Sequence, residues 1–169
     1  MPEMCTDSWQ GRALVVGGGG IGRALSAELA RRQSSLQVTL ATRHPVSDQE
    51  WTVDLQCTDS LSKLTEQLRG DSHPLRVVIN ATGRLHGPSY QPEKRLQHAE
   101  QSALLDSFAI NAAGPLLLAK AVEPVLSRDS PFHFASLSAR VGSIGDNRSG
   151  GWYAYRSAKA AQNMMLRCL

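Results

Sequence analysis

The chain has 169 residues, of which 41% are hydrophobic and 20% are charged, so it is long enough to bury one core and too short for two ordinary domains. Its 18 Lys and Arg residues and 15 Asp and Glu residues give a net charge of +3, and because the cations are scattered along the sequence we expect no nucleic-acid partner. The longest apolar stretch, 109–122, includes Asn111, Pro115 and Lys120 and is shorter than the ~20 residues of a membrane span, so we expect no membrane partner.

The first half of the chain alternates short β-branched runs with helical patterns, which is typical of βαβ units. Residues 13–16 are expected to form a strand and residues 21–32 a helix, with a glycine-rich break between them. A second strand is predicted over 36–41 and a short third strand over 52–55, followed by a helix over 59–68. This order predicts an α/β fold built on a parallel sheet.

The same alternation continues in the second half of the chain. A strand is predicted over 76–80, in which Val77, Val78 and Ile79 form a continuous apolar run, as expected for a strand that is covered on both faces. The polar residues 89–100 are expected to form a loop that leads into a long apolar helix over 102–126. A fifth strand is predicted over 132–136.

Three glycines between the first strand and the first helix, Gly17, Gly19 and Gly22, have the spacing G-x-G-x-x-G. Glycines allow a tight turn and a close approach of the backbone to a pyrophosphate, which the N–H groups at the start of the following helix stabilise. The pattern predicts a Rossmann-type dinucleotide-binding turn that includes Gly20 and Ile21. The alternative is a flexible glycine-rich turn that binds no ligand.

The end of the second strand carries Ala41, Thr42 and Arg43, about twenty residues after the glycines. An NAD-dependent enzyme usually has an acidic residue here, which binds the adenosine ribose hydroxyls. A guanidinium at this position pairs instead with a 2′-phosphate, so we favour NADP over NAD as the cofactor. The alternative is that Arg43 is only a solvated loop residue before Pro45.

A glycine-rich loop over 141–151 precedes a predicted helix from residue 153 to the end of the chain, which contains Tyr155 and Lys159. Four residues apart on a helix, these side chains share a face. An ammonium ~5 Å from the phenol, at an effective dielectric of about 20, favours the phenolate by roughly 3 kcal/mol, or about two pKa units. We therefore expect Tyr155 to donate and accept protons. The alternative is an exposed pair with no chemical role.

These motifs, in this order, resemble those of the short-chain dehydrogenase/reductase family over essentially the whole chain. The segment Asn80-Ala81-Thr82-Gly83 is similar to the family's sequence after the fourth strand, and Asp54 stands where the family has an acid near the adenine. Asn111 and Ser138 correspond to its relay asparagine and substrate-binding serine. The run from Gly142 to Tyr155 is similar to the C-factor-like branch, whose members include carbonyl reductases.

The resemblance implies a single NAD(P)-binding Rossmann domain over residues 1–169, with a doubly wound parallel sheet in a three-layer α/β/α arrangement. In that reading Tyr155 exchanges a proton with the substrate oxygen, Lys159 lowers the tyrosine pKa and holds the nicotinamide ribose, Ser138 binds the substrate oxygen and Asn111 orders a relay water. The residues expected to contact the cofactor are Gly17, Gly19, Gly20, Ile21, Gly22, Thr42, Arg43, Asp54, Leu55, Asn80, Ala81, Gly83, Tyr155 and Lys159.

The function implied is an NADP-dependent oxidoreductase that transfers a hydride between the nicotinamide and a small carbonyl compound or secondary alcohol. The alternative is a non-catalytic protein of the same fold that binds nucleotides or a partner protein. The two long C-terminal helices are the surfaces through which the family usually associates, so we expect a homodimer or homotetramer.

The sequence departs from the family pattern in three places. Val16 stands where the family's first glycine belongs, so the turn is one residue shorter. Ala139 stands where the family usually has its serine, so Ser136 and Ser143 remain alternatives to Ser138. The family continues into two further strands that are missing here, so we expect the fifth strand to be a sheet edge.

Cysteine and histidine spacing predicts neither disulfides nor a metal site. The three cysteines, Cys5, Cys57 and Cys168, are far apart and outside any CxxC motif, and the five histidines form no ligand pair on one helix. The first ten residues carry acids and no apolar run, so we expect no signal peptide and a cytoplasmic location.

Overall fold

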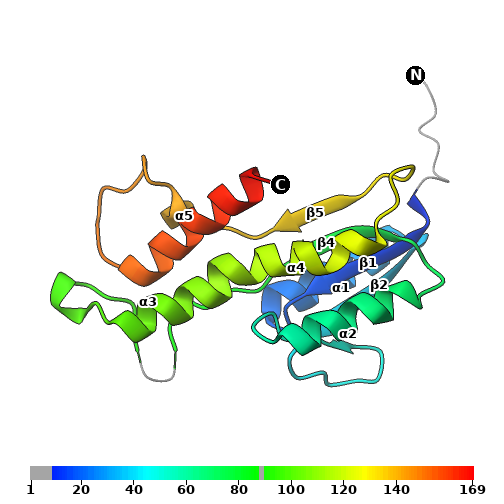
Figure 1. Ribbon diagram of the computed structural model, residues 1–169, viewed down its shortest axis with the longest axis horizontal. Helices are drawn as coiled ribbons and strands as arrows, with labels where there is room; N and C mark the ends of the chain where they lie inside the picture. The colour runs from blue at the N-terminus through cyan, green and yellow to red at the C-terminus, as the bar shows by residue number, and fades with distance from the viewer. Residues whose placement is uncertain (1–8, 88–89) are drawn as a thin grey trace.

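The computed structural model describes residues 9–87 and 90–169, which form a layer of parallel strands with helices on both sides (Figure 1). The strands are β1 (Gly11–Val16), β2 (Leu36–Thr42), β3 (Trp51–Thr52), β4 (Leu75–Asn80) and β5 (His133–Ser136). The helices are α1 (Gly20–Arg32), α2 (Thr58–Arg69), α3 (Gln101–Phe108), α4 (Gly114–Val122) and α5 (Tyr153–Arg167).

The five strands are all parallel and lie in the order β3-β2-β1-β4-β5. At its carboxyl end β1 pairs Val16 with Ala41 of β2 on one side and with Asn80 of β4 on the other. The chain order reverses at β1, and in sheets of this kind the ligand crevice lies outside the strand ends at that point. The predicted doubly wound α/β fold is therefore confirmed.

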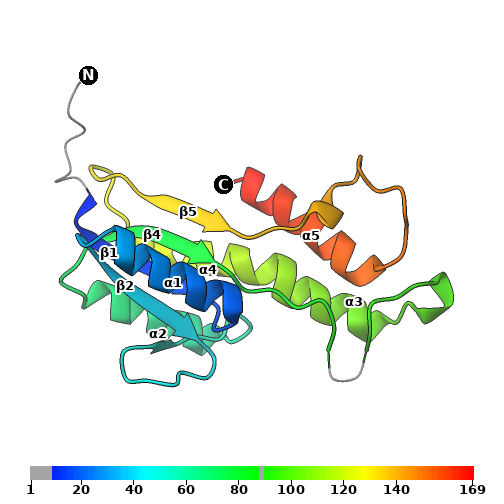
Figure 2. The same cartoon turned by 180° about the vertical axis from the view of Figure 1, so that it is seen from behind.

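Helices cover the two faces of the sheet unequally. Helices α2 and α4 cover one face, and α1 lies on the other (Figures 1 and 2). The buried core between the sheet, α2 and α4 consists of Leu14, Val16, Ala41, Val53, Leu55, Leu61, Leu64, Leu68, Leu75, Val78, Leu118, Ala121 and Val122. These apolar residues recur every three or four positions on the helices, which explains why each helix presents one face to the sheet.

The long helix predicted over 102–126 is continuous in the structure but not uniform. Between α3 and α4 lies a π-helical turn, Ala109–Ala113, and a short 3₁₀ turn follows α4. The helical stretch Gln101–Val125 has 25 residues, and an 18-residue window within it has a mean hydropathy of 1.4, so by length and composition alone this stretch could cross a membrane. It is longer than the apolar stretch 109–122 on which the sequence-based expectation was based. Leu118 and Val122 are buried in the core, and a core helix of this kind passes the same test.

Other predicted boundaries moved. The third strand was expected over 52–55, but β3 contains only Trp51–Thr52. The N–H of Val53 still donates to the carbonyl oxygen of Thr42 of β2 at 2.9 Å, but the N–H of Asp54 donates to the Ser60 hydroxyl of α2 at 2.9 Å, which ends the pairing with β2. The loop over 90–100 carries one 3₁₀ turn, Leu96–His98, and residue 89 lies outside the described residues.

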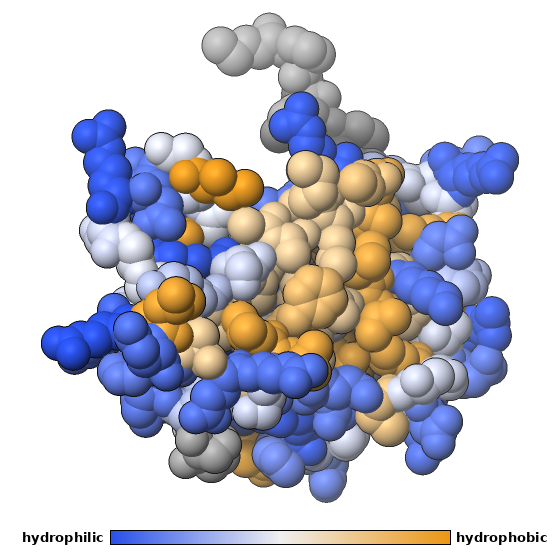
Figure 3. Space-filling model, turned by 60° about the vertical axis from the view of Figure 1, so that its left-hand side comes forward, coloured by the Kyte–Doolittle hydropathy of each residue, from blue (hydrophilic) through white to orange (hydrophobic). Residues whose placement is uncertain are grey.

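Apolar surface remains exposed on the helices and beside β5. Among the described residues β5 pairs only with β4, and Met164 of α5 is 63% exposed. Figure 3 shows hydrophobic side chains gathered over the middle of one face. Other exposed apolar residues of the helices α3, α4 and α5 are Leu104, Leu105, Phe108, Leu117 and Tyr153.

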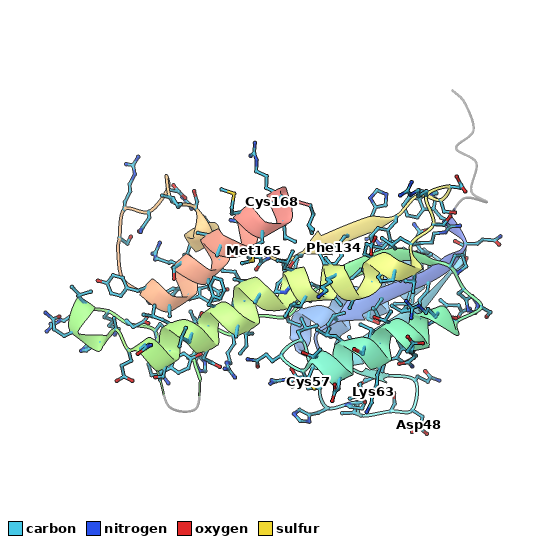
Figure 4. The ribbon with its side chains drawn as sticks, in the orientation of Figure 1. Asp48, Cys57, Lys63, Phe134, Met165 and Cys168 are labelled. Carbon is cyan, nitrogen blue, oxygen red and sulfur yellow. The ribbon has the colours of Figure 1, made fainter. Side chains whose placement is uncertain are left out.

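The two described cysteines lie far apart. Cys57 precedes α2 and Cys168 follows α5, and both are exposed free thiols (Figure 4). The same view places Phe134 on β5 and Met165 near the end of α5. Cys5 lies outside the described residues.

Candidate active site

The turn between β1 and α1 depends on two glycines that pack against backbone. Gly17 has a φ of +127°, and a Cβ atom there would lie 2.9 Å from the carbonyl carbon of Ala81. A Cβ atom on Gly22 would lie 1.8 Å from the carbonyl oxygen of Gly17. The first turn of α1 therefore packs directly on the glycine loop, which only glycine permits at both positions.

Two other glycines of the turn face open space. A Cβ atom on Gly19 or Gly20 would meet no atom within 4 Å. Helix α1 begins at Gly20, and no side chain caps its N-terminus. The N–H groups of its first turn are therefore available to an anion, and the open space allows a phosphate to approach them.

A cleft of about 400 Å³ opens beside this turn at the carboxyl ends of the strands. Its volume lies within the range of small-molecule binding sites. The lining residues are Val16, Gly17, Gly18, Gly19, Arg23, Ala41, Thr42, Arg43, His44, Val53, Asp54, Leu55, Gln56, Ala81, Thr82, Gly83, Arg84 and Ile110.

Most of the residues predicted to contact a cofactor line this cleft. Gly17, Gly19, Thr42, Arg43, Asp54, Leu55, Ala81 and Gly83 all do so. Gly20, Ile21, Gly22, Asn80, Tyr155 and Lys159 do not line it. Ile21 is 63% exposed. Gly22 and Asn80 are buried, so they support the residues of the cleft wall without lining the cleft themselves.

The end of the cleft next to β2 carries positive charge. Arg43 lines it and is exposed, with His44 beside it. Arg23 of α1 also lines it, donating through Nε to the carbonyl oxygen of Gly18 at 3.0 Å and through a terminal nitrogen to Glu50 at 2.6 Å. Glu50 offsets part of the Arg23 charge, which leaves Arg43 as the more accessible cation.

Asn80 supports the loop after β4. Its amide nitrogen donates to the Ser136 hydroxyl of β5 at 2.8 Å. Its carbonyl oxygen accepts hydrogen bonds from the backbone N–H and the hydroxyl of Thr82, at 3.2 and 2.7 Å. Asn80 thus joins β4 to β5 and shapes the 80–83 loop.

The cleft approaches the predicted catalytic residues at Gly83. A Cβ atom on Gly83 would lie 3.4 Å from Asn111 Oδ1 and 3.7 Å from Lys159 Nζ. Asn111 lies in the π-helical turn, where its amide accepts from the N–H of Arg84 at 2.8 Å and donates to the carbonyl of Arg84 at 2.9 Å. A third bond joins it to the hydroxyl of Ser107 at 3.1 Å. The π-helical turn therefore holds the loop that carries Gly83.

The relation between Tyr155 and Lys159 differs from the prediction. The Lys159 ammonium lies 5.9 Å from the centre of the Tyr155 ring and donates to the backbone carbonyl oxygen of Leu137 and to the side-chain Oε1 of Gln162. Burial raises the pKa of Tyr155 above that of an ordinary phenol and lowers the pKa of Lys159 to about 8. The expected fall in the tyrosine pKa was wrong for this structure, because burial disfavours the phenolate and the ammonium directs its hydrogen bonds to other groups.

The comparisons with known proteins are consistent with this arrangement. Residues 12–169 match the family described as short chain dehydrogenase. The chain belongs to the short-chain dehydrogenase family.

Two relatives of this short-chain dehydrogenase are informative. It is 48% identical over 113 residues to the 1-hydroxy-2-glutathionyl-2-methyl-3-butene dehydrogenase of a Rhodococcus species, a match that covers 67% of this chain and 46% of the relative. It is 43% identical over 63 residues, 37% of this chain, to C-signal of Myxococcus xanthus, and the match covers 38% of that protein. The matched region therefore spans less than half of each relative.

Solved structures share the fold of this short-chain dehydrogenase. A short-chain dehydrogenase/reductase from Burkholderia multivorans with bound NADP has a TM-score of 0.77 and 24% identity, covering 94% of this chain and 71% of that one. A carbonyl reductase from Pseudomonas aeruginosa PAO1 has a TM-score of 0.75 and 24% identity, with coverage of 94% and 75%.

The three candidate serines of this short-chain dehydrogenase have different surroundings. Ser138 is exposed and donates to Asn163 Oδ1 of α5 at 2.6 Å. Ser136 is partly buried and accepts hydrogen bonds from Asn80 and from Gln162. Ser143 is exposed, and its hydroxyl accepts a hydrogen bond from the backbone N–H of Asp146 at 3.3 Å. The assignment of the serine therefore remains a prediction.

Sequence reasoning missed two residues that matter in this short-chain dehydrogenase. Arg23 follows the last glycine of the motif, and its position on the first turn of α1 is the signal that would have placed it beside the cleft. Gln162 is buried and bonded to Lys159, and it lies three residues after the lysine on the same helix. That spacing brings two side chains together on one helical face.

Proposed function

We propose that this chain is an NADP-dependent oxidoreductase that reduces a small carbonyl compound or oxidises a secondary alcohol. The observation that carries the proposal is the meeting of Gly83, Asn111 and Lys159. Gly83 lines the cleft, and a Cβ atom on it would lie within 4 Å of Asn111 Oδ1 and of Lys159 Nζ, so this end of the cleft adjoins two of the predicted catalytic residues.

The residues of the cleft fit a dinucleotide. The open space at Gly19 and Gly20 and the uncapped start of α1 suit a pyrophosphate, and Asp54 and Leu55 form part of the wall on the adenine side. Arg43 at the end of β2 suits a 2′-phosphate, which favours NADP, and the Burkholderia structure with bound NADP agrees with this choice. NAD is the alternative cofactor.

The nicotinamide cofactor supplies the hydride when bound. The residues of the chain hold the substrate and move its proton. Tyr155 donates its hydroxyl proton to the substrate oxygen during reduction, and Lys159, charged at neutral pH, stabilises the phenolate that remains. Ser138 is our candidate for binding the substrate oxygen, with Ser136 and Ser143 as alternatives. Asn111 holds the Arg84 backbone and so the cleft wall next to the reacting groups.

We also propose that the chain forms a homodimer or homotetramer through α3, α4 and α5. These helices expose Leu105 at 62% and Phe108 at 43%, and contiguous apolar surface of this kind marks association sites. Sedimentation equilibrium of the wild type and of the Leu105→Asp variant tests this proposal, and a wild type that remains monomeric rejects it.

Hydride transfer is tested directly by following NADPH absorbance with a panel of small aldehydes and ketones. We expect the wild type to consume NADPH and the Tyr155→Phe variant to retain NADPH binding while losing turnover by roughly a thousandfold, within the range of a general acid's contribution. Equal turnover in the variant, or tight NADPH binding without turnover by the wild type, contradicts the proposed reaction and favours a non-catalytic nucleotide-binding protein.

Cofactor choice is tested by thermal unfolding with each nucleotide. We expect saturating NADPH to raise the melting temperature more than NADH does at the same concentration, because the tighter ligand stabilises the folded state more. Equal increases in melting temperature would reject the choice of NADP while leaving the hydride-transfer reaction open to NADH.

A further inference from the structure

The Lys159 ammonium is buried without an acidic partner. Its residue is 2% exposed, and none of the ion pairs among residues 9–87 and 90–169 includes it. It donates to the carbonyl oxygen of Leu137 at 2.9 Å and to Gln162 Oε1 at 2.7 Å. Two neutral oxygens therefore replace the water that the ammonium loses on burial.

Gln162 uses both ends of its amide in this contact. It is fully buried, and its nitrogen donates to the hydroxyl of Ser136 at 3.0 Å and to the carbonyl oxygen of Leu137 at 3.2 Å. These acceptors at the end of β5 orient the amide, because a reversed amide would direct its N–H groups at the ammonium and its oxygen at the Leu137 carbonyl.

The same network continues to the floor of the cleft. Ser136 accepts from Asn80, which in turn accepts from the backbone and hydroxyl of Thr82 in the cleft wall. Hydrogen bonds therefore connect the carboxyl ends of β4 and β5 with Gln162 and, through it, with Lys159. A chain of buried and satisfied polar groups of this kind holds its members in one arrangement.

We propose that Gln162 is a positioning residue for Lys159. The amide oxygen of Gln162 holds the Lys159 ammonium next to the cleft and keeps the ammonium charged. The inference rests on the proposed function, in which the charged lysine stabilises the tyrosine phenolate. A hydrogen bond to a charged group favours the charged form, so loss of the amide oxygen makes the neutral amine easier to form.

Among the described residues, the other charged groups near α5 form no ion pair with Lys159. The buried Glu93 carboxylate accepts a hydrogen bond from the N–H of Ala154 in the first turn of α5, and Arg156 of α5 is partly buried. From α3, Asp106 pairs with Arg84, and from the 3₁₀ turn before α5, Arg140 pairs with Asp146. Lys120 of α4 is exposed, and on α5 itself the titratable neighbour is Tyr155. Gln162 is therefore the side chain whose replacement changes the hydrogen bonding of Lys159 directly.

The test compares Gln162→Leu, which removes the amide oxygen, with Gln162→Glu, which places a carboxylate at the same distance. The pH titration of Lys159 is followed in the nucleotide-free protein by NMR of ¹³Cε-labelled lysine, and the peak is assigned by its loss in Lys159→Arg. We expect the titration to move down by roughly one to two pH units in Gln162→Leu, the equivalent of one charge-assisted hydrogen bond. In Gln162→Glu it moves up, because the ammonium gains a charged partner.

The enzyme assay gives a second readout, in which we expect the two variants to shift the pH profile of kcat in opposite directions. Activity that requires the charged lysine is lost as pH rises through its pKa, so the alkaline limb of the kcat profile shifts to lower pH in Gln162→Leu and to higher pH in Gln162→Glu. A purely structural role would lower kcat in both variants without opposite shifts. Met164→Ala, an exposed change on the same helix, is the matched control and leaves both readouts unchanged.

An unchanged lysine titration in a folded Gln162→Leu protein overturns the inference. If that variant does not fold, an unchanged titration in Gln162→Glu overturns it equally. A wild type that transfers no hydride contradicts the proposed function instead, since the NMR titration is measured without nucleotide and still reports on the contact between Gln162 and Lys159.

Discussion

Replacing Asp71 with asparagine tests the electrostatics of the fold at the end of the sheet opposite the cleft. The Asp71 carboxylate, 7% exposed, accepts hydrogen bonds from the guanidinium of Arg12, from the backbone N–H of His73 at 3.0 Å and from the His73 ring. Burial raises the pKa of Asp71, but these hydrogen bonds outweigh it and bring the pKa from 3.8 down to about 2.

This fall in pKa sets the size and the sign of the expected effect. A difference of about 1.8 units corresponds to roughly 2 kcal/mol of stabilisation of the folded state by the ionised carboxylate. Because the folded-state pKa lies below the unfolded value, the stabilisation is complete above about pH 5 and is lost as the pH falls through 4 toward 2. The side-chain amide of the variant cannot ionise, so the variant lacks this contribution at every pH.

Urea unfolding at a series of pH values measures the effect. We expect the free energy of unfolding of Asp71→Asn to lie about 2 kcal/mol below that of the wild type at pH 7, with the difference shrinking to near zero at pH 2. Asp48→Asn, an exposed position in the loop after β2, is the matched control and should follow the wild type (Figure 4). A difference between Asp71→Asn and the wild type that stays constant from pH 7 to pH 2 would refute the reasoning.

Three further predictions concern the cleft and the core. Gly22→Ala places a methyl group 1.8 Å from the Gly17 carbonyl oxygen, so we expect the free energy of unfolding to fall by about 1–3 kcal/mol and NADPH binding, measured by titration, to weaken. Gly145→Ala, where the methyl group meets open space, is the control and should bind NADPH as the wild type does. Leu118→Ala removes a fully buried core side chain and should lower the free energy of unfolding by about 3 kcal/mol; a loss below about 1 kcal/mol by urea unfolding would show that the core repacks. Arg43→Ala should reduce the ratio of NADPH to NADH affinity roughly tenfold or more, as measured by calorimetry, and an unchanged ratio would mean that Arg43 does not contact a 2′-phosphate.

Much of the fold could be predicted because local pattern and tertiary burial agree in it. The apolar runs that became β1, β2 and β4 are central strands, covered on both faces, and such strands are recognisable from composition alone. The glycine spacing also placed the turn correctly, because Gly17 and Gly22 are needed for backbone packing that no larger residue allows. The length of the third strand was overestimated because Val53 and Leu55 are apolar residues buried in the core, and an apolar, buried residue can belong to a loop as well as to a strand.

The electrostatics of the candidate site could not be predicted from spacing. The Tyr155-to-Lys159 interval predicts proximity, but the sign of the tyrosine pKa change depends on the balance of burial and attraction. The lysine directs its hydrogen bonds to Leu137 and Gln162, and Leu137 comes from a loop 22 residues away in the sequence. Contacts of this kind depend on the packed structure of α5 against the end of β5, which a single sequence does not encode in any local pattern.

The π-helical turn at Ala109–Ala113 lies between α3 and α4, and the number of residues in it sets how α4 is rotated relative to α3. A π turn holds one more residue than an α-helical turn, and each residue rotates an α-helix by about 100°. Removing one residue from the turn would therefore rotate α4 against α3 by that angle. Either Leu118 would leave the core or Asn111 would lose its hydrogen bonds to Arg84 in the cleft wall, so the inserted residue lets one helix pack into the hydrophobic core at one end and support the candidate site at the other.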